Sequence, residues 1–422
     1  MEKGSSVSIT DQPKPAAMSR SEWILLALLI ASIFVNYIDR GNLSIAAPLM
    51  QKDLHLSPVQ IGLLLSGFFW SYAVLQLIGF SGWLSDVLPV GFVLAGGFVI
   101  WSLATFSTGL LSSFAALYAA RMLLGAGESL AYPCYSRVFA SDFAQHHRGR
   151  ANALLDAGSK LGPAVGSLLG GVLLVTAGWR WFFILLGVVA LVWLIPWLKY
   201  MPHSYAKRPC HTRPAHILSL LRRRSAWGTF LGHFCGNYFW FFLLTWLPTY
   251  LVNERQFSIQ RMTVINSAAL FITAAGTVTA GFVSDRVIAR GAPLGTVRRT
   301  VVVSGLICSS VILAVAFLPG TVAAIALLFF SCLAFGAYTS NHWAITQTLA
   351  GARMAGRWTS IQNGIGNLSG VAAPLVAGYA VEATGTSKAA FVVSAIIVLV
   401  GAVMWGVVVG PISEVDWSPD SR

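Results

Sequence analysis

Charged side chains are scarce in this chain: Asp, Glu, Lys and Arg make up 10% of its 422 residues, whereas 56% are hydrophobic. A soluble globular domain carries about 25% charged residues. One core cannot bury so much apolar surface, so lipid must cover a large part of it. The scarcity of charge argues against a soluble domain and predicts an integral membrane protein.

Cysteine is also scarce and forms no pattern. The chain has five cysteines, four of them in apolar stretches, with no Cys-x-x-Cys pair and no metal-ligand spacing to histidine. We therefore expect neither a disulfide framework nor a metal site. The sequence also contains no His-Glu-x-x-His motif, phosphate-binding glycine loop or nucleophile–base constellation. Without such motifs we expect no enzyme activity and no cofactor.

What the chain does have is a series of long apolar stretches. They are continuously apolar and rich in glycine, whereas membrane strands would alternate over about ten residues. We therefore predict an all-α integral membrane protein with twelve transmembrane helices. Their expected ranges are 21–49, 58–82, 89–109, 112–138, 149–176, 179–199, 225–252, 260–284, 298–318, 321–349, 356–382 and 386–410.

Lys and Arg are distributed unevenly among the connecting segments. Of the 28, 20 lie in segments on one side of the predicted membrane, 5 lie on the other, and Arg40, Arg121 and Lys160 lie inside spans. Cytosolic segments carry the excess of Lys and Arg, so both termini are predicted to be cytosolic. This placement explains the net charge of +13 without a nucleic-acid partner.

The predicted helices fall into two similar halves. Gly82–Asp86 resembles Gly281–Asp285, and Arg148–Arg150 resembles Gly356-Arg357, each about 200 residues later. Duplicated six-helix units are typical of transporters. The predicted parts are an N-terminal tail (1–20, without the features of a signal peptide), an N-terminal six-helix bundle (21–199), a linker (200–224), a C-terminal six-helix bundle (225–410) and a C-terminal tail (411–422), with linker and tails cytosolic.

Ionisable residues inside the predicted spans mark the candidate site, because a charge within the membrane is costly. Arg40 is the best candidate for binding an anion, since its planar guanidinium can hold a carboxylate at two points. The alternative is a structural ion pair with Asp39, Glu128 or another acid. Arg40 would fill both roles, one after the other, if its ion pair breaks when the substrate arrives.

Proton coupling needs a buried carboxyl group, and Glu128 and Asp39 are the candidates. Arg121 and Glu128 are seven residues apart and share one helix face, so Arg121 is predicted to adjust the pKa of Glu128. The alternative is that both acids are static partners of Arg121 and Arg40.

Lys160 is a second candidate anion site, in which case the substrate carries two carboxylates or one carboxylate with many hydroxyls. Asp156 lies four residues earlier on the same helix face. The alternative is therefore that Lys160 is neutralised by Asp156 and binds no substrate. Polar and aromatic residues in the spans are predicted to complete the substrate site, although interhelical hydrogen bonding would also explain them. These residues are Tyr37, Tyr72, Tyr132, Asn237, Trp343, Asn363 and Asn367.

The residues Gly281–Gly291 resemble the signature cytoplasmic loop of the major facilitator superfamily. This resemblance implies gating roles for Asp285, Arg286 and Arg290, and for Asp86 in the first copy, which lacks the following basic residues. Four further segments resemble the anion:cation symporter family, which includes sugar-acid permeases and sialin. They are Tyr37–Asn42, Gly125–Pro133, Thr245–Leu251 and Gln362–Asn367. The resemblance also implies anion binding at Arg40 and proton transfer at Asp39 and Glu128.

We therefore expect a proton-coupled symporter that brings a small organic anion, a sugar acid or a dicarboxylate, into a bacterial cell by alternating access. The expected partners are the anion, protons and the lipid of the inner membrane, and the expected state is a monomer. The alternatives are a proton-driven exporter of drugs or metabolites and a non-transporting membrane receptor or enzyme. An exporter would favour buried acids without paired cations, against which Arg40 and Lys160 count.

Overall fold

The computed structural model describes residues 18–202, 205 and 217–417, and this part of the chain contains helices and no strand. Most of the predicted N-terminal tail and linker therefore lies outside the described residues, so their predicted roles stay predictions. The helices of the first half are α1 (Arg20–Asp53), α2 (Pro58–Leu77), α3 (Phe80–Val87), α4 (Val90–Thr108), α5 (Phe114–Glu128), α6 (Ala131–Asp142), η1 (Gln145–His147), α7 (Arg148–Thr176), α8 (Gly178–Val192) and α9 (Leu194–Tyr200). Those of the second half are α11 (Ile217–Leu221), α12 (Arg224–Thr245), α13 (Leu247–Asn253), α14 (Ile259–Ala289), α15 (Leu294–Ser309), α16 (Ile312–Phe317), α17 (Thr321–Thr384), α18 (Lys388–Val403) and η2 (Met404–Val408).

Local sequence signals set where the first helices begin. Ser19 caps α1 by accepting from the backbone N–H of Glu22, whose carboxylate accepts in return from the Ser19 N–H. Ser57 and Gln60 form the same reciprocal cap on α2, and Pro58 occupies its first turn. Such caps satisfy N–H groups that have no partner within the helix.

Several membrane spans are broken helices. α2 and α3 bend by 58° relative to each other, next to Gly79, which has a positive φ of 72°. α17 is two helices joined at Gly351, whose φ of 58° and ψ of −179° are not helical. Glycine adopts a positive φ far more readily than residues that carry a Cβ atom. Within the described residues, seven helical segments are long and apolar enough to cross a membrane, some of them made of two consecutive elements such as α8 with α9, and the bent pair of α2 and α3 makes an eighth.

The twelve predicted spans all correspond to helical segments once these breaks are taken into account, which confirms the predicted all-α membrane fold. The ends differ by a few residues. α1 continues to Asp53 and the segment α5–α6 continues to Asp142, because hydropathy marks the lipid-facing part of a helix and not its polar ends.

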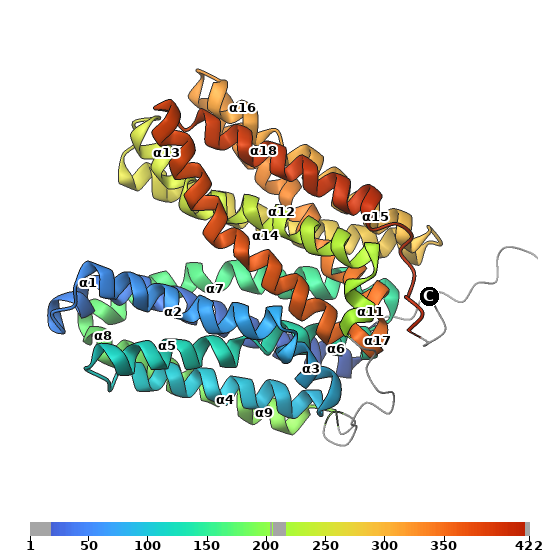
Figure 1. Cartoon of the computed structure of the whole chain (residues 1–422), viewed down its shortest axis with the longest axis horizontal. Coiled ribbons are helices and arrows are strands. Elements are labelled where there is room, and N and C mark those ends of the chain that lie inside the picture. Colours follow the sequence, from blue (N-terminus) through green and yellow to red (C-terminus); the bar gives the residue numbers. More distant parts are fainter. Residues whose placement is uncertain (1–17, 203–204, 206–216, 418–422) are drawn as a thin grey trace, which may run out of the picture.

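The helices form two bundles, which Figure 1 shows one above the other. We call α1–α9 the first bundle and α11–α18, with η2, the second bundle. α17 belongs to the second bundle, where it packs on α12, α14 and α15, but it also contacts α2, α3, α6 and α7 of the first. α7 and α14 likewise pack together across the divide. These crossing helices place residues of both bundles around one central space.

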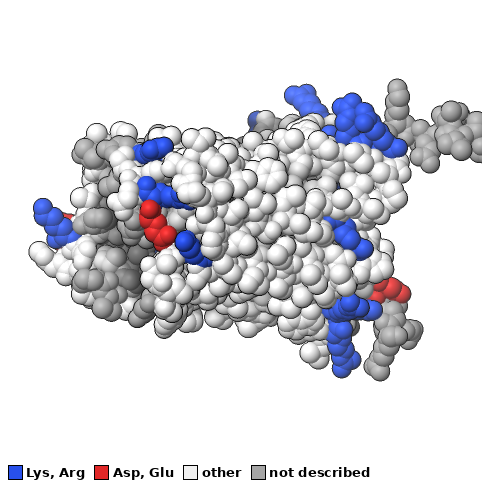
Figure 2. Space-filling view, turned by 90° about the horizontal axis from the view of Figure 1, so that it is seen from above, with Lys and Arg blue, Asp and Glu red and all other residues white. Residues whose placement is uncertain are grey.

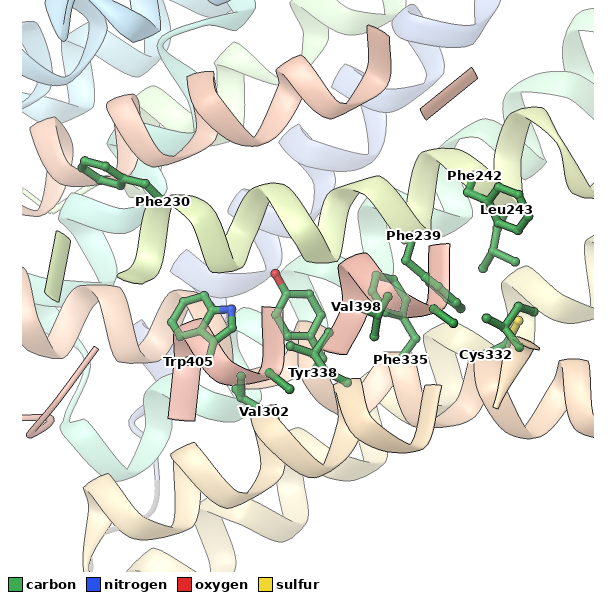
Figure 3. Close-up of a cluster of buried hydrophobic side chains, with 14 of the residues drawn as sticks. Phe230, Phe239, Phe242, Leu243, Val302, Cys332, Phe335, Tyr338, Val398 and Trp405 are labelled. Atoms are coloured by element: carbon green, nitrogen blue, oxygen red, sulfur yellow. The ribbon is translucent and has the colours of Figure 1, made fainter. Parts of the chain in front are cut away.

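Each bundle has its own aromatic core. In the first bundle the rings of Phe98 and Trp193 stack at 4.2 Å. In the second, shown in Figure 3, the Phe239 and Phe335 rings lie 4.7 Å apart. Tyr338 lies in this cluster with its hydroxyl directed toward α12. The second core therefore reaches the central space through Tyr338.

Charged side chains are distributed along the molecule as a membrane protein requires. On the face shown in Figure 2 they lie toward the two ends, and the middle is uncharged. Large apolar side chains such as Val189, 63% exposed, and Tyr379, 71% exposed, lie on the outer surface. An uncharged belt with exposed apolar residues matches the hydrocarbon layer of a bilayer.

Candidate functional site

A cavity of about 230 Å³ lies between the two bundles. Its wall is formed by α1, α2, α6 and α7 on one side and by α12, α14 and α17 on the other. The lining residues are Tyr37, Arg40, Phe69, Tyr132, Asp156, Lys160, Pro163, His233, Asn237, Trp240, Phe241, Leu244, Leu270, Phe335, Tyr338, Thr339, His342, Trp343, Asn363 and Asn367. They include eight of the nine residues predicted from the sequence to bind substrate, and Tyr72 is the exception.

Arg40 is held by an acid and by aromatic rings. Its Nε donates to Oε2 of Glu128 at 3.0 Å. Its guanidinium carbon lies 4.6 Å from the ring centre of Tyr37 and 4.7 Å from that of Tyr72, a favourable arrangement of a cation over π faces. Its Nη2 has no hydrogen-bond partner among the described residues. Arg40 therefore keeps an unused N–H donor while it is paired with Glu128.

The two predicted proton carriers lie behind the cavity wall. Glu128 is 0% and Asp39 is 1% exposed, and neither lines the cavity. Asp39 Oδ1 accepts from Asn42 Nδ2 at 3.1 Å. The other carboxylate oxygens, Asp39 Oδ2 and Glu128 Oε1, have no hydrogen-bond partner within the described part of the chain.

Arg121 lies farther from Glu128 than Arg40 does. Its Nε donates to the carbonyl of Leu64 at 3.4 Å, and it attracts Glu128 and Asp39 at longer range. The close ion-pair partner of Glu128 is therefore Arg40, on another helix. The predicted adjusting role of Arg121 is compatible with this longer-range attraction and stays a prediction.

Lys160 on α7 lies in the cavity wall beside Asp156. Its Nζ donates to Asp156 Oδ1 at 2.9 Å and lies 4.3 Å from the ring centre of Trp240 on α12. Asp156 therefore pairs with Lys160 one helical turn away, which is the arrangement expected if Asp156 neutralises Lys160 and Lys160 is not a second anion site. The geometry of the pair joins a charge of the first bundle to an aromatic ring of the second.

The wall of the second bundle is polar and aromatic without Lys, Arg, Asp or Glu among its described residues. The His233 and His342 rings stack at 5.0 Å, and the Trp343 ring lies 5.5 Å from that of Tyr132 of the first bundle, tilted by 35°. Asn237 lies 3.4 Å from the His233 Nε2. One wall thus carries the charges and the other carries hydrogen-bonding groups and rings.

Asn363 connects the bundles at the edge of the cavity. Its Nδ2 donates to the Tyr72 hydroxyl at 2.7 Å and to Gln76 Oε1 at 2.9 Å. Asn367 Nδ2 donates to Asn363 Oδ1 at 3.1 Å, so the two asparagines share one helix face. Tyr72, which is 0% exposed, contacts both Asn363 and the guanidinium of Arg40.

The bundles are also joined at the end predicted to be cytosolic, by two equivalent contacts. Asp86 on α3 accepts from the backbone N–H groups of Gly356 and Arg357, each at 3.0 Å. Asp285 on α14 accepts from those of Gly149 at 3.2 Å and Arg150 at 2.7 Å. Each aspartate therefore binds a helix of the other bundle through backbone groups, so the missing basic residues after Asp86 do not prevent this contact.

The helices cross very closely at the first of these contacts. A Cβ atom on Gly82 would lie 2.4 Å from the Gly356 carbonyl oxygen. Arg286 and Arg290, also predicted to belong to the gate, are exposed near the end of α14. At the opposite end, the hydrogen bonds of the described residues stay within one bundle, as in Trp179 with Asp53 and Tyr250 with Val315.

Some residues of the site were not selected from the sequence. Trp240 contacts Lys160, and Gln76 contacts Asn363. Asn152, likewise not selected, exchanges two hydrogen bonds of 2.9 Å with Gln347 of the other bundle. An amide in an apolar span is the only signal for such contacts, and it does not name the partner.

The comparisons with known proteins agree with this architecture. The sequence pattern of the Major Facilitator Superfamily matches residues 29–374. A hexuronate transporter of Bacillus subtilis is 31% identical over 88% of this chain and 90% of its own length. A probable galactarate/D-glucarate transporter of Escherichia coli, GarP, is 30% identical over 96% of this chain and 98% of its own.

Solved structures agree with the fold. The crystal structure of the Escherichia coli fucose:proton symporter FucP matches with a TM-score of 0.70 at 17% identity. The match covers 92% of this chain and 98% of that protein. At this identity the likeness concerns the arrangement of the helices alone.

Proposed function

Because the chain belongs to the Major Facilitator Superfamily and is a multi-pass membrane transporter, we propose that it is a proton-coupled symporter of a small organic anion. The anion is a sugar acid or a dicarboxylate. It enters the cell through alternating access of the central cavity to the two sides of the membrane.

The observation that carries this proposal is the Arg40–Glu128 ion pair at 3.0 Å. Only Arg40 of the two lines the cavity, so a substrate carboxylate reaches the guanidinium from the cavity and Glu128 reaches it from behind. A negatively charged Glu128 competes with the substrate for the same cation. When a proton neutralises Glu128, the full charge and fork of Arg40 become available to the anion.

Electrostatics explains why proton and anion would travel together. Moving a single charge into a low-dielectric site is costly, whereas an anion that enters with a proton on Glu128 leaves the net charge of the site unchanged. Asp39 is a second buried acid within electrostatic reach of Glu128. We assign it the second proton-carrying role, with Arg121 adjusting both acids.

The cycle then follows from the contacts between the bundles. The bundles are joined by Asp86 and Asp285 at the predicted cytosolic end, so this conformation corresponds to a cavity that receives protons and anion from outside. Rocking of the bundles would break these two contacts and release the anion and protons to the cytosol. Arg286 and Arg290 lie near the Asp285 contact, where we propose that they help to hold the closed state.

Two further observations support a sugar acid. The relatives named above are a hexuronate transporter and a probable galactarate/D-glucarate transporter. The cavity also offers hydrogen-bonding side chains and flat rings, which suit the hydroxyls and C–H faces of such an acid. We assign substrate contacts to Tyr37, Tyr132, Asn237, Trp343, Asn363 and Asn367, and a supporting contact to Tyr72.

The orientation and surroundings complete the proposal. The excess of Lys and Arg at one predicted face favours both termini in the cytosol, and the relatives named above are bacterial, which favours an inner membrane. The described residues of this one chain line the cavity from both bundles, which supports our proposal of a monomer. A proton-driven exporter is less well supported because the cavity places Arg40 and Lys160 in its wall.

The experiment is uptake of radiolabelled D-glucuronate and D-glucarate into proteoliposomes, with and without an inward proton gradient. The proposal predicts accumulation that needs the gradient and is lost in Arg40→Ala. Accumulation that is independent of the proton gradient would contradict proton coupling. Uptake that is unchanged in Arg40→Ala would contradict the anion site.

A further inference from the structure

The donors of Lys160 are already occupied within the protein. A lysine ammonium has three N–H donors. Nζ donates to Asp156 Oδ1 at 2.9 Å and to Ser159 Oγ at 3.3 Å, and it faces the Trp240 ring at 4.3 Å. Lys160 is also only 8% exposed. A substrate carboxylate would have to displace one of these neighbours to bind it.

Asp156, by contrast, has an oxygen to offer. Its Oδ1 is bonded to Lys160 and accepts from Ser159 Oγ at 3.3 Å. Its Oδ2 is buried and has no hydrogen-bond partner among the described residues, and the residue lines the cavity at 7% exposure. A buried acceptor without a donor is unfavourable. A ligand that brings an O–H group to this oxygen would therefore be stabilised.

The charges of the wall add a second argument. The described lining residues include two cations, Arg40 and Lys160, and one acid, Asp156. With Lys160 neutralised by Asp156, Arg40 is left as the one fixed cation that a ligand can use in that wall. One cation matches one carboxylate.

We propose that the Asp156–Lys160 pair determines specificity by accepting a substrate hydroxyl at Asp156 Oδ2 and by repelling a second carboxylate. The substrate class is then a hydroxylated monocarboxylate with its carboxylate on Arg40. A carboxylate at the far end has no proton to donate to Oδ2 and carries the same charge. This inference rests on the proposed function, because it takes Arg40 as the anion site, and it narrows the choice between sugar acid and dicarboxylate.

The test uses pairs of acids that differ at one carbon. D-Gluconate ends in CH2OH where D-glucarate ends in a second carboxylate, and D-galactonate and galactarate form the same pair. Affinities of the purified full-length protein are measured by calorimetry at one pH. We expect each monoacid to bind at least about 10-fold more tightly than its diacid, the lower end of the range for a charged hydrogen bond. Equal affinity, or tighter binding of the diacids, would overturn the inference.

Asp156→Asn sharpens the test, because it keeps the size of the side chain but removes its charge and leaves Lys160 unneutralised. The monoacid-to-diacid affinity ratio should fall by about 10- to 150-fold. If this variant does not fold, Asp156→Asn with Lys160→Gln removes both charges together and should also lower the ratio. An unchanged ratio in the folded variant overturns the inference. A purely structural pair would change stability and leave the ratio as it was.

Asp53→Asn is the matched control. Asp53 is the last residue of α1 and is paired with Arg180 at 3.5 Å. It does not line this cavity, so Asp53→Asn should leave the monoacid-to-diacid affinity ratio unchanged. The outcomes also separate the two proposals. If none of the four acids binds, the proposed function fails and the inference fails with it. If monoacid and diacid bind equally and both need Arg40, the inference alone fails.

Discussion

Arg40 on α1 and Glu128 on α5 form an ion pair of 3.0 Å in which the cation lines the cavity and the acid, 0% exposed, lies behind it. This order places one guanidinium between two competing anions. Substrate can approach it from one side, and Glu128 holds it from the other. Protonation of Glu128 therefore shifts the competition toward the substrate, which is the basis of the coupling that we propose.

The first prediction concerns the fork of Arg40. Arg40→Ala should abolish anion binding, and Arg40→Lys should restore little of it, because an ammonium cannot bind a carboxylate at two points. Loss of one charge-assisted hydrogen bond weakens binding by about 10- to 150-fold, so the affinity of Arg40→Lys for the anion should be lower by at least this factor. Calorimetry with D-glucuronate measures it. Near-normal affinity of Arg40→Lys would show that charge alone is sufficient.

A second prediction separates the ring of Tyr72 from its hydroxyl. Tyr72→Phe keeps the ring beneath the Arg40 guanidinium but removes the acceptor for Asn363 Nδ2, now at 2.7 Å. A neutral hydrogen bond contributes about 0.5–1.5 kcal/mol, so the loss of affinity caused by a displaced Asn363 should not exceed about 2- to 13-fold. Tyr379→Phe, at an exposed position on α17, is the control and should change nothing. Loss of affinity as complete as in Arg40→Ala would mean that the hydroxyl does more than bind Asn363.

A third prediction tests closure at the predicted cytosolic end. Even the Cβ atom of a substituted Gly82 would lie 2.4 Å from the Gly356 carbonyl oxygen, and Gly82→Val adds two methyl groups to it. Overpacking costs about 1–3 kcal/mol, so the closed population should fall by about 5- to 150-fold relative to the open one. Distances between spin labels on α3 and α17 should lengthen accordingly.

The control for that experiment is Gly96→Val on α4. A Cβ on Gly96 meets no atom within 4 Å, so the label distances should remain those of the unaltered protein. If Gly82→Val leaves the distances unchanged as well, the contact between α3 and α17 does not hold the closed state.

Hydropathy and local spacing predicted much of this molecule. The spans were visible because lipid-facing helices need long apolar runs, and Arg40, Glu128 and Lys160 were visible because a charge in such a run is rare. The Asp156–Lys160 pair could be anticipated because (i, i+4) neighbours on a helix meet whatever surrounds them. These signals all lie within one helix.

What remained hidden depends on how helices pack against one another. The sequence offered Asp39, Glu128 or another acid as an ion-pair partner of Arg40 without choosing between them, and the folded structure selects Glu128. The contact of Trp240 with Lys160 joins residues 80 positions apart in different bundles. No periodicity within one helix encodes the depth and rotation at which another helix meets it, so such partners emerge only from the folded structure.

The most direct test of the account is the transport behaviour of Glu128→Gln. Glutamine has the shape of the protonated acid and cannot release a proton, so Arg40 should stay available to the anion. We predict that proteoliposomes containing this variant still exchange labelled for unlabelled D-glucuronate. They should no longer accumulate it when an inward proton gradient is imposed. Accumulation against the substrate gradient by Glu128→Gln would contradict the account and assign the coupled proton to another residue.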